Sequence, residues 1–194
     1  SGDIFMDRNL GAVGTDYTKV TACGLYYQWG RKDPFPYPAS FTNNARPASF
    51  IYHDGHAYGT IRPEDYDARE VMSVEWATQH PTTFIHKADY EVDEPEEDVL
   101  DWLFRSHHNL WGNTTEQGYD VSKVCRKTIY DPCTPGWLVP DACDFEGIAM
   151  SQTQLPYCVN IVYSGTKTVR YPAGGTFDGD SYSGAGTVSY THLR

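Results

Sequence analysis

The sequence predicts a mixed α+β protein whose short elements are joined by long loops. Residues 99–104 place apolar side chains at helical spacing, which favours a helix. Residues 157–163 and 168–171 have strand-like composition and are separated by a Ser-Gly turn. The chain also contains 12 prolines and 17 glycines, which interrupt regular structure and keep the predicted elements short.

The N-terminal third is predicted to hold one strand, one helix and one long loop. Residues 4–6 suit a short strand. The segment CGLYYQWGR, residues 23–31, has apolar side chains on one helical face, and Gly30 offers a stop for the helix. Residues 40–68 are polar and poor in aliphatic side chains, so we expect a loop insertion there, with room for one hairpin.

The middle of the chain is predicted to alternate between helix and strand. Residues 69–77 fit either a strand or a short helix, and residues 80–86, HPTTFIH, fit a turn that enters a strand. Seven acidic side chains lie between residues 91 and 101, and Pro95 with acids after it is typical of a first helical turn.

Residues 174–186 are rich in glycine and offer almost nothing that packs.

Composition and charge exclude several function classes. A formal net charge of −11 argues against binding to nucleic acid or to an anionic membrane surface. No run of eighteen apolar residues occurs, so we expect no direct membrane insertion. The 15 tyrosines give amphipathic contact area that suits recognition of sugars or proteins. The chain reads as an excised domain or a mature fragment.

A search for catalytic and metal-binding patterns gives little. The five cysteines lack CxxC spacing, and no nucleophile elbow, phosphate loop or dinucleotide fingerprint occurs, so we predict neither an enzyme nor a cofactor. Five scattered cysteines favour an oxidising compartment and leave one without a partner in this chain, with the connectivity open. The histidines near residues 53–56 and 107–108 read as exposed loop residues.

Two acidic segments are weak calcium candidates, because hard cations take carboxylate oxygens. Residues 91–98 read better as a solvated helix start. Asp178 and Asp180 in FDGD lack the ordered spacing of a calcium loop. We therefore predict no metal site.

The stretch YDPCTPGWLVP, residues 130–140, is predicted to be a rigid structural corner. Its three prolines exclude a regular helix. Gly136 supplies a turn conformation that other residues avoid, Cys133 is presented for bonding and Trp137 for burial.

Five phrases in order resemble one family. They are DRNLGA (residues 7–12), YYQWGRKDPFP (26–36), HPTTFI (80–85), NLWG (109–112) and KTIYDPCTPGWLVP (127–140). The chain resembles, over residues 3–172, the major paralogous domain of Fibrobacter succinogenes, which is common in surface and fimbrillin-like proteins of Bacteroidetes. The resemblance implies a C-type-lectin-like fold with a few helices flanking small twisted antiparallel sheets. It also implies export as a lipoprotein or pilus component anchored at the outer membrane.

The chain departs from the family pattern at its end. The family continues into further strands with a final cysteine, so we expect residues 1–186 to form one incomplete domain whose C-terminal strands are missing. The ending VSYTHLR resembles translated sequencing-adapter DNA, which makes residues 187–194 a candidate non-native tail. On this interpretation the natural partner of Cys133 lies in the missing strands. The family also has Pro at Thr134 and Arg at Leu138.

Three functions from different classes are compatible with the sequence. We expect first a cell-surface adhesion or recognition domain that binds glycan or protein. The alternative is a structural pilus subunit or tip module with another pilin as partner, and an oxidase or hydrolase on a formylglycine-generating-enzyme-like fold ranks last. The tyrosines that lie in predicted loops, where a sugar ring could stack, are Tyr52, Tyr58, Tyr66 and Tyr182.

Overall fold

The chain folds as two compact units. The sheet unit comprises residues 1–26, 36–49 and 140–194, and the helical unit comprises residues 27–35 and 50–139. The computed structural model describes residues 4–42, 44–49, 55–86, 102–105, 107, 110–112, 127–140, 142–145, 147–153, 158–163 and 167–184. The mixed α+β class predicted from the sequence is confirmed. The single-domain boundary at residue 186 stays a prediction, because residues 185–194 lie outside the described part.

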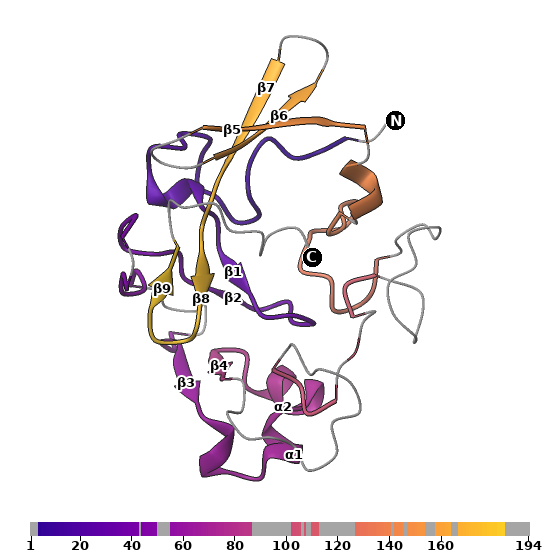
Figure 1. Ribbon diagram of the computed structural model, residues 1–194. Coiled ribbons are helices and arrows are strands. Elements are labelled where there is room, and N and C mark those ends of the chain that lie inside the picture. Colours follow the sequence, from indigo (N-terminus) through magenta and orange to yellow (C-terminus); the bar gives the residue numbers. More distant parts are fainter. Residues whose placement is uncertain are drawn as a thin grey trace. The chain divides into compact units, whose positions relative to one another are not determined.

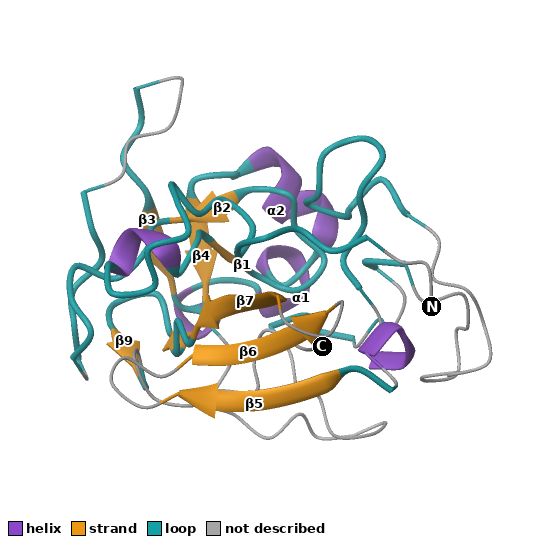
Figure 2. Ribbon diagram, turned by 90° about the horizontal axis from the view of Figure 1, so that it is seen from above, coloured by secondary structure: helices purple, strands orange, loops and turns teal. Residues whose placement is uncertain are grey.

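The largest sheet of the sheet unit is an antiparallel meander of three strands, seen side by side in Figure 2. It consists of β5 (Ala149–Thr153), β6 (Cys158–Tyr163) and β7 (Lys167–Pro172), in the order β5-β6-β7. Cys158 lies opposite Pro172 in the register. The two strands predicted from residues 157–163 and 168–171 are confirmed as β6 and β7.

A short hairpin of β8 (Thr176–Phe177) and β9 (Tyr182–Ser183) follows β7 (Figure 1). The Tyr182 ring is fully buried, and its centroid lies 4.8 Å from that of Tyr26 and 4.6 Å from that of Phe177. The prediction that residues 174–186 hold almost nothing that packs is therefore wrong. Two aromatic rings on paired strands bury enough apolar surface to fix a glycine-rich segment.

The N-terminal segment of the sheet unit contains one short 3₁₀ helix, η1 (Val20–Ala22). A second one, η3 (Ala142–Phe145), precedes β5. The strand predicted at residues 4–6 does not form, although the Met6 carbonyl accepts a hydrogen bond from the Tyr171 hydroxyl.

The helix predicted for CGLYYQWGR is also wrong. Here β1 (Tyr26–Tyr27) pairs with β2 (Pro34–Phe35). Gly24 and Gly30 flank β1 at φ values of +80° and +77°, which lie outside any right-handed helix. The apolar residues whose spacing suggested a helix instead lie in and around β1, which is extended and is joined to β2 through a turn at Gly30.

The helical unit is built on a parallel pair of strands with helices in the connection. β3 (Gly59–Ile61) leads through η2 (Pro63–Asp65), α1 (Ala68–Val71) and α2 (Val74–Gln79) to β4 (Thr83–Ile85). β3 and β4 pair in parallel, because the helices return the chain to the same end of the pair, so the expectation of antiparallel sheets fails here. The prediction of a loop over residues 40–68 is wrong for its last part, whereas the strand predicted within residues 80–86 is confirmed.

The helical unit has its own apolar core. Trp102 is buried in it, and the partly buried Trp29 packs against it. Trp137, predicted to be buried, is only half-buried. The helix predicted from residues 91–101 lies outside the described residues. The buried members of this core are Val71, Met72, Ala77, Ile85, Trp102, Leu103 and Leu110.

Candidate functional site

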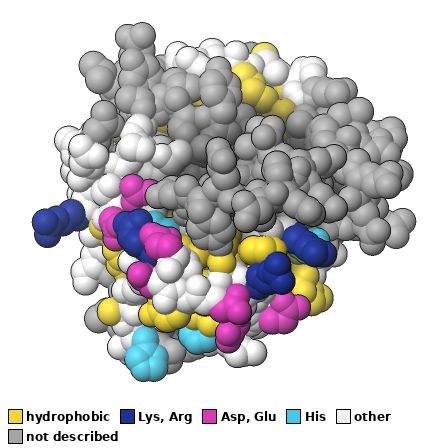
Figure 3. Space-filling view, turned by 60° about the horizontal axis from the view of Figure 1, so that its bottom comes forward, with side chains coloured by type: hydrophobic (Ala, Val, Ile, Leu, Met, Phe, Trp, Pro, Cys, Tyr) yellow, Lys and Arg dark blue, Asp and Glu magenta, His cyan; other side chains and the backbone are white. Residues whose placement is uncertain are grey.

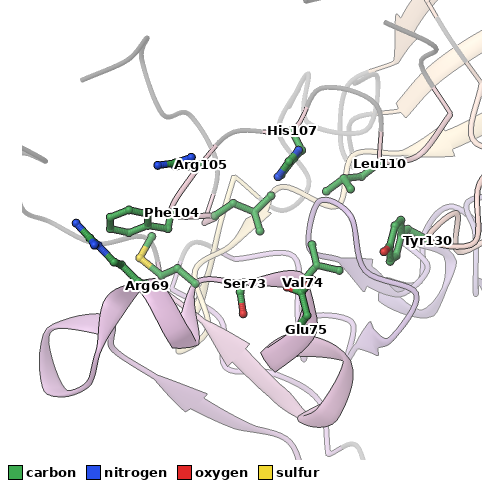
Figure 4. Close-up of a pocket in the computed structure, with 11 residues that line it drawn as sticks. Arg69, Ser73, Val74, Glu75, Phe104, Arg105, His107, Leu110 and Tyr130 are labelled. Carbon is green, nitrogen blue, oxygen red and sulfur yellow. The ribbon is translucent and has the colours of Figure 1, made fainter. Parts of the chain in front are cut away.

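An open groove in the helical unit encloses about 470 Å³ and combines apolar, aromatic and basic side chains. We call it the arginine groove. In the view of Figure 4, Arg69, Phe104 and Arg105 lie at one end, with Leu110 and Tyr130 at the other. Its lining consists of Arg69, Met72, Ser73, Val74, Glu75, Leu103, Phe104, Arg105, His107, Leu110 and Tyr130.

One wall of the arginine groove is the corner between α1 and α2, and side-chain caps hold it in place. The Asp67 carboxylate accepts a hydrogen bond from the backbone N–H of Arg69 at 3.0 Å and begins α1. The Ser73 hydroxyl accepts from the backbone N–H of Trp76 at 3.2 Å and donates to the carbonyl of Glu70 at 2.6 Å. Ser73 therefore ends one helix and begins the next, which orients Arg69 and Glu75.

The opposite wall is formed by residues 102–105 and 107, and backbone and tryptophan hydrogen bonds hold it. Phe104 N–H donates to the carbonyl of Met72 at 3.0 Å, which joins this wall to the end of α1. The Trp29 indole donates to the carbonyl of His107 at 2.7 Å, and the Trp102 indole donates to the carbonyl of Trp29 at 2.8 Å. These hydrogen bonds, and not a helix or strand, hold residues 102–105, which include Leu103 at the floor of the groove.

The charge of the groove comes from side chains that reach solvent. The guanidinium carbon of Arg69 lies 5.4 Å from the Phe104 ring centroid, a cation–π contact, and Arg105 next to it is exposed. Glu75 adds one carboxylate. Basic, acidic and hydrophobic side chains also lie next to one another on the described part of the face shown in Figure 3. Two guanidinium groups beside an aromatic ring can bind a planar anionic group and stack against a ring-shaped ligand.

A second polar cluster surrounds Arg31 and is structural. Arg31 is 4% exposed, and its guanidinium donates to the carbonyls of Thr83, His80 and Pro81 at 2.7, 3.0 and 3.3 Å and to Gln28 Oε1 at 2.9 Å. The Gln28 amide in turn donates to the Ile85 carbonyl at 2.6 Å and accepts from the Ile85 N–H at 3.2 Å, as a neighbouring strand would. The phrase YYQWGR thus carries a cluster that fixes the chain around β4.

A third polar cluster explains the corner at residues 130–140. Asp131 is fully buried, and its carboxylate accepts from Lys127 Nζ at 2.9 Å and from the N–H groups of Cys133 and Val139 at 2.7 and 3.1 Å. Gly136 adopts φ +88°, which confirms its predicted turn conformation. The corner is therefore closed by Asp131, a residue that sequence reasoning missed.

Cys133 in this corner is a half-buried free thiol. Burial, with the neighbouring Asp131 carboxylate, raises its pKa to about 11, while Lys127 lowers it slightly. Such a thiol is a poor nucleophile near neutral pH, because little thiolate is present.

The four tyrosines predicted to bind a sugar are not among the groove residues. Tyr182 is fully buried, so we correct the expectation that its ring is available to a ligand. Tyr66 is 60% exposed and Tyr58 is half-buried, so both stay candidates, and Tyr52 lies outside the described residues.

The calcium candidates take different positions. The Asp178 carboxylate accepts hydrogen bonds from the N–H groups of Asp180 and Ser181 at 2.9 and 2.8 Å, so it serves its own turn. Residues 91–98, and also His53 and His108, lie outside the described residues, whereas His56 and His107 are exposed. Within the described ranges, no group of three or more His, Cys, Asp or Glu side chains is placed to hold a metal ion.

Comparison with known proteins identifies no relative of this chain. No protein-family model, curated protein or solved structure matches the chain. Among the helices of the described residues, none combines the length and the apolar character that crossing a bilayer requires.

Proposed function

We propose that the protein is an extracellular recognition domain of a bacterial surface protein and that it binds glycan through the arginine groove. The observation that carries the proposal is the groove itself, where the buried floor of Met72 and Leu103, the Phe104 ring and two arginines meet. Sugar rings offer an apolar C–H face for aromatic contact and hydroxyl groups for hydrogen bonds. The groove supplies a partner for each.

The two arginines narrow the class of glycan. A guanidinium forms paired, charge-assisted hydrogen bonds to carboxylate or sulfate oxygens. In a chain with a net charge of −11, a local pair of cations is a feature that an anionic ligand would use. We therefore propose acidic glycans, which carry carboxylate or sulfate groups, as the ligand class.

The finer fold is part of the same proposal. We propose a C-type-lectin-like fold, supported by the mixed α+β class, the small sheets and the long loops. The phrases that carry the family resemblance contain Gln28, Arg31 and Asp131, which form the polar clusters described above. Because Gln28, Arg31 and Asp131 have structural roles, the phrases that contain them would indicate a shared fold and not a shared ligand.

A glycan array that includes neutral and acidic sugars tests the function, with the double variant Arg69→Gln/Arg105→Gln and the control Tyr66→Ser. The wild type is expected to bind acidic glycans, and the double variant to bind at least about tenfold more weakly, since a hydrogen bond to a charged group contributes about 1.5–3 kcal/mol. Tyr66→Ser should bind as the wild type does. Titration calorimetry with the best array ligand measures the ratio.

Three results would contradict the proposal. A flat array from the folded chain, or equal binding by the double variant, excludes the arginine groove as a glycan site. Binding lost in Tyr66→Ser alone would instead place the site on the loop tyrosines. Capture of another pilin from the native surface, together with a flat array, would favour the structural pilus subunit.

A further inference from the structure

Two cysteines of the sheet unit, Cys23 and Cys158, lie in the same buried region although 135 positions separate them in sequence. Each is 1% exposed. Cys23 follows η1 directly, and its N–H donates to the carbonyl of Val20 at 3.0 Å. Cys158 is the first residue of β6.

The Asn9 side chain brings the two positions together. Its amide nitrogen donates to the Cys23 carbonyl at 3.0 Å and to the Pro172 carbonyl at 3.0 Å. Pro172 is the cross-strand partner of Cys158 in the β6–β7 pair. One amide group therefore spans from the Cys23 backbone to the strand position directly beside Cys158.

The surrounding contacts hold this arrangement from both sides. The Tyr26 hydroxyl donates to the carbonyl of Gly174, which joins a residue shortly after Cys23 to a residue shortly after Pro172. A Cβ added to Gly24 would overlap the Leu10 carbonyl oxygen, so the backbone next to Cys23 packs closely against the N-terminal turn.

The surroundings of both thiols oppose ionisation. Burial raises the pKa of Cys23 to about 12, and the nearby Cys158 sulfur contributes to the same rise. Burial raises the pKa of Cys158 as well, against a lowering by Arg170. Once folded, the pair is therefore almost entirely in the unreactive thiol form at neutral pH.

We propose that Cys23 and Cys158 form a disulfide that locks the N-terminal segment onto β6. Two thiols give up two protons and two electrons and form one S–S bond, while a disulfide oxidant, such as oxidised glutathione or a disulfide-exchanging oxidoreductase, is reduced to two thiols. Because burial suppresses the thiolates, the exchange takes place during folding, before the region closes. A disulfide joins Cα atoms less than about 7 Å apart, so the proposal requires Cys23 to lie within that distance of Cys158.

The inference goes beyond ligand recognition, and its occurrence in the cell rests on the proposed extracellular location, since such compartments preserve disulfides. The test is refolding of the full chain with reduced and oxidised glutathione, followed by alkylation in denaturant and peptide mapping without reduction. Trypsin isolates Cys23, and a second protease that cuts after acidic residues separates Cys158 from Cys143 at Asp144. The expected product is a peptide pair joined through Cys23 and Cys158 that disappears on reduction.

Stability gives a second readout. The oxidised wild type should melt about 5–15 °C above the Cys158→Ser variant, because the bond closes a long loop. The matched control Cys133→Ser should melt close to the wild type. Reductant should fail to cleave the bond in the native protein and should cleave it in denaturant, since both sulfurs are buried.

Recovery of both cysteines in alkylated form, or of either one joined to another cysteine, overturns the inference. Because this peptide map is made on the wild type, it tests the pairing even if Cys158→Ser does not fold. The oxidant is supplied in vitro, so a negative map rejects the pairing without touching the proposed surface location. A flat glycan array, conversely, leaves the pairing intact.

Discussion

The two compact units fix their interiors in opposite ways. The helical unit places a buried cation, Arg31, among backbone carbonyls, whereas the sheet unit packs the rings of Tyr26, Phe177 and Tyr182 against one another. A guanidinium has donors in fixed directions, so it dictates where each carbonyl must lie. Aromatic packing is less directional and tolerates a change that keeps the ring.

A buried cation and a buried aromatic ring therefore differ in the substitutions that each tolerates. In the helical unit, losing the cation leaves several carbonyls without a donor, and such a loss costs more than the net value of the bonds. In the sheet unit, losing a ring leaves a cavity whose cost depends on how far the surroundings relax. Substitutions that preserve either charge or shape separate the two cases.

The largest expected effect is that of Arg31→Ala. It should lower the free energy of unfolding by about 3–5 kcal/mol, because several part-buried carbonyls lose their donor and each such loss costs about 1–3 kcal/mol. Arg31→Lys keeps the charge but not the planar fork, so it should recover only part of this loss. Urea denaturation of the three proteins measures the difference, and a lysine variant as stable as the wild type would show that directionality is unimportant.

Tyr182→Ala should follow with a loss of about 3–4 kcal/mol, as for other buried aromatic side chains that are cut to alanine. Tyr182→Phe keeps the ring and should stay within about 1 kcal/mol of the wild type. The exposed control Tyr66→Ala should change stability by less than about 0.5 kcal/mol. Equal losses for Tyr182→Ala and Tyr66→Ala in the same urea titration would contradict the buried position of Tyr182.

The smallest effect is the pH dependence contributed by Cys133. Its pKa is raised from 9.0 to about 11 in the folded protein, so folding favours the protonated thiol. The stability that this shift contributes is complete below about pH 9 and is lost as the pH rises toward about 11. Alkylation of native Cys133 by iodoacetamide should accelerate over the same range, and a rate that has already levelled off at pH 9 would contradict the raised pKa.

Sequence reasoning succeeded where local pattern and tertiary environment agree. The strand-like composition of residues 157–163 and 168–171 agrees with the sheet that they join as β6 and β7, so predicting these strands required no knowledge of distant partners. The turn at Gly136 depends on one residue's backbone freedom, which the sequence shows directly. The strand within residues 80–86 was also predicted from the composition of neighbouring residues.

The failures arose where distant residues decide the outcome. The apolar spacing after Cys23 suits a helix, yet pairing with β2 and the Gly30 turn make it a strand. Tyr182 sits in a segment that looks too polar to pack, yet its ring packs against those of Tyr26 and Phe177 and is buried. The arginine groove joins residues near 69–75 with residues 103–105, 107, 110 and 130, and no spacing within the sequence predicts that meeting.

The sequence by itself determined the α+β class, the two strands β6 and β7 and the proline-rich corner, because propensity and turn chemistry act over a few neighbouring residues. Only the tertiary structure decided that Asp131 closes this corner, that Arg31 organises the chain around β4, and that Asn9 links Cys23 to the strand beside Cys158. These roles depend on contacts between residues far apart in the chain. A buried polar side chain takes its meaning from the partners that folding brings to it.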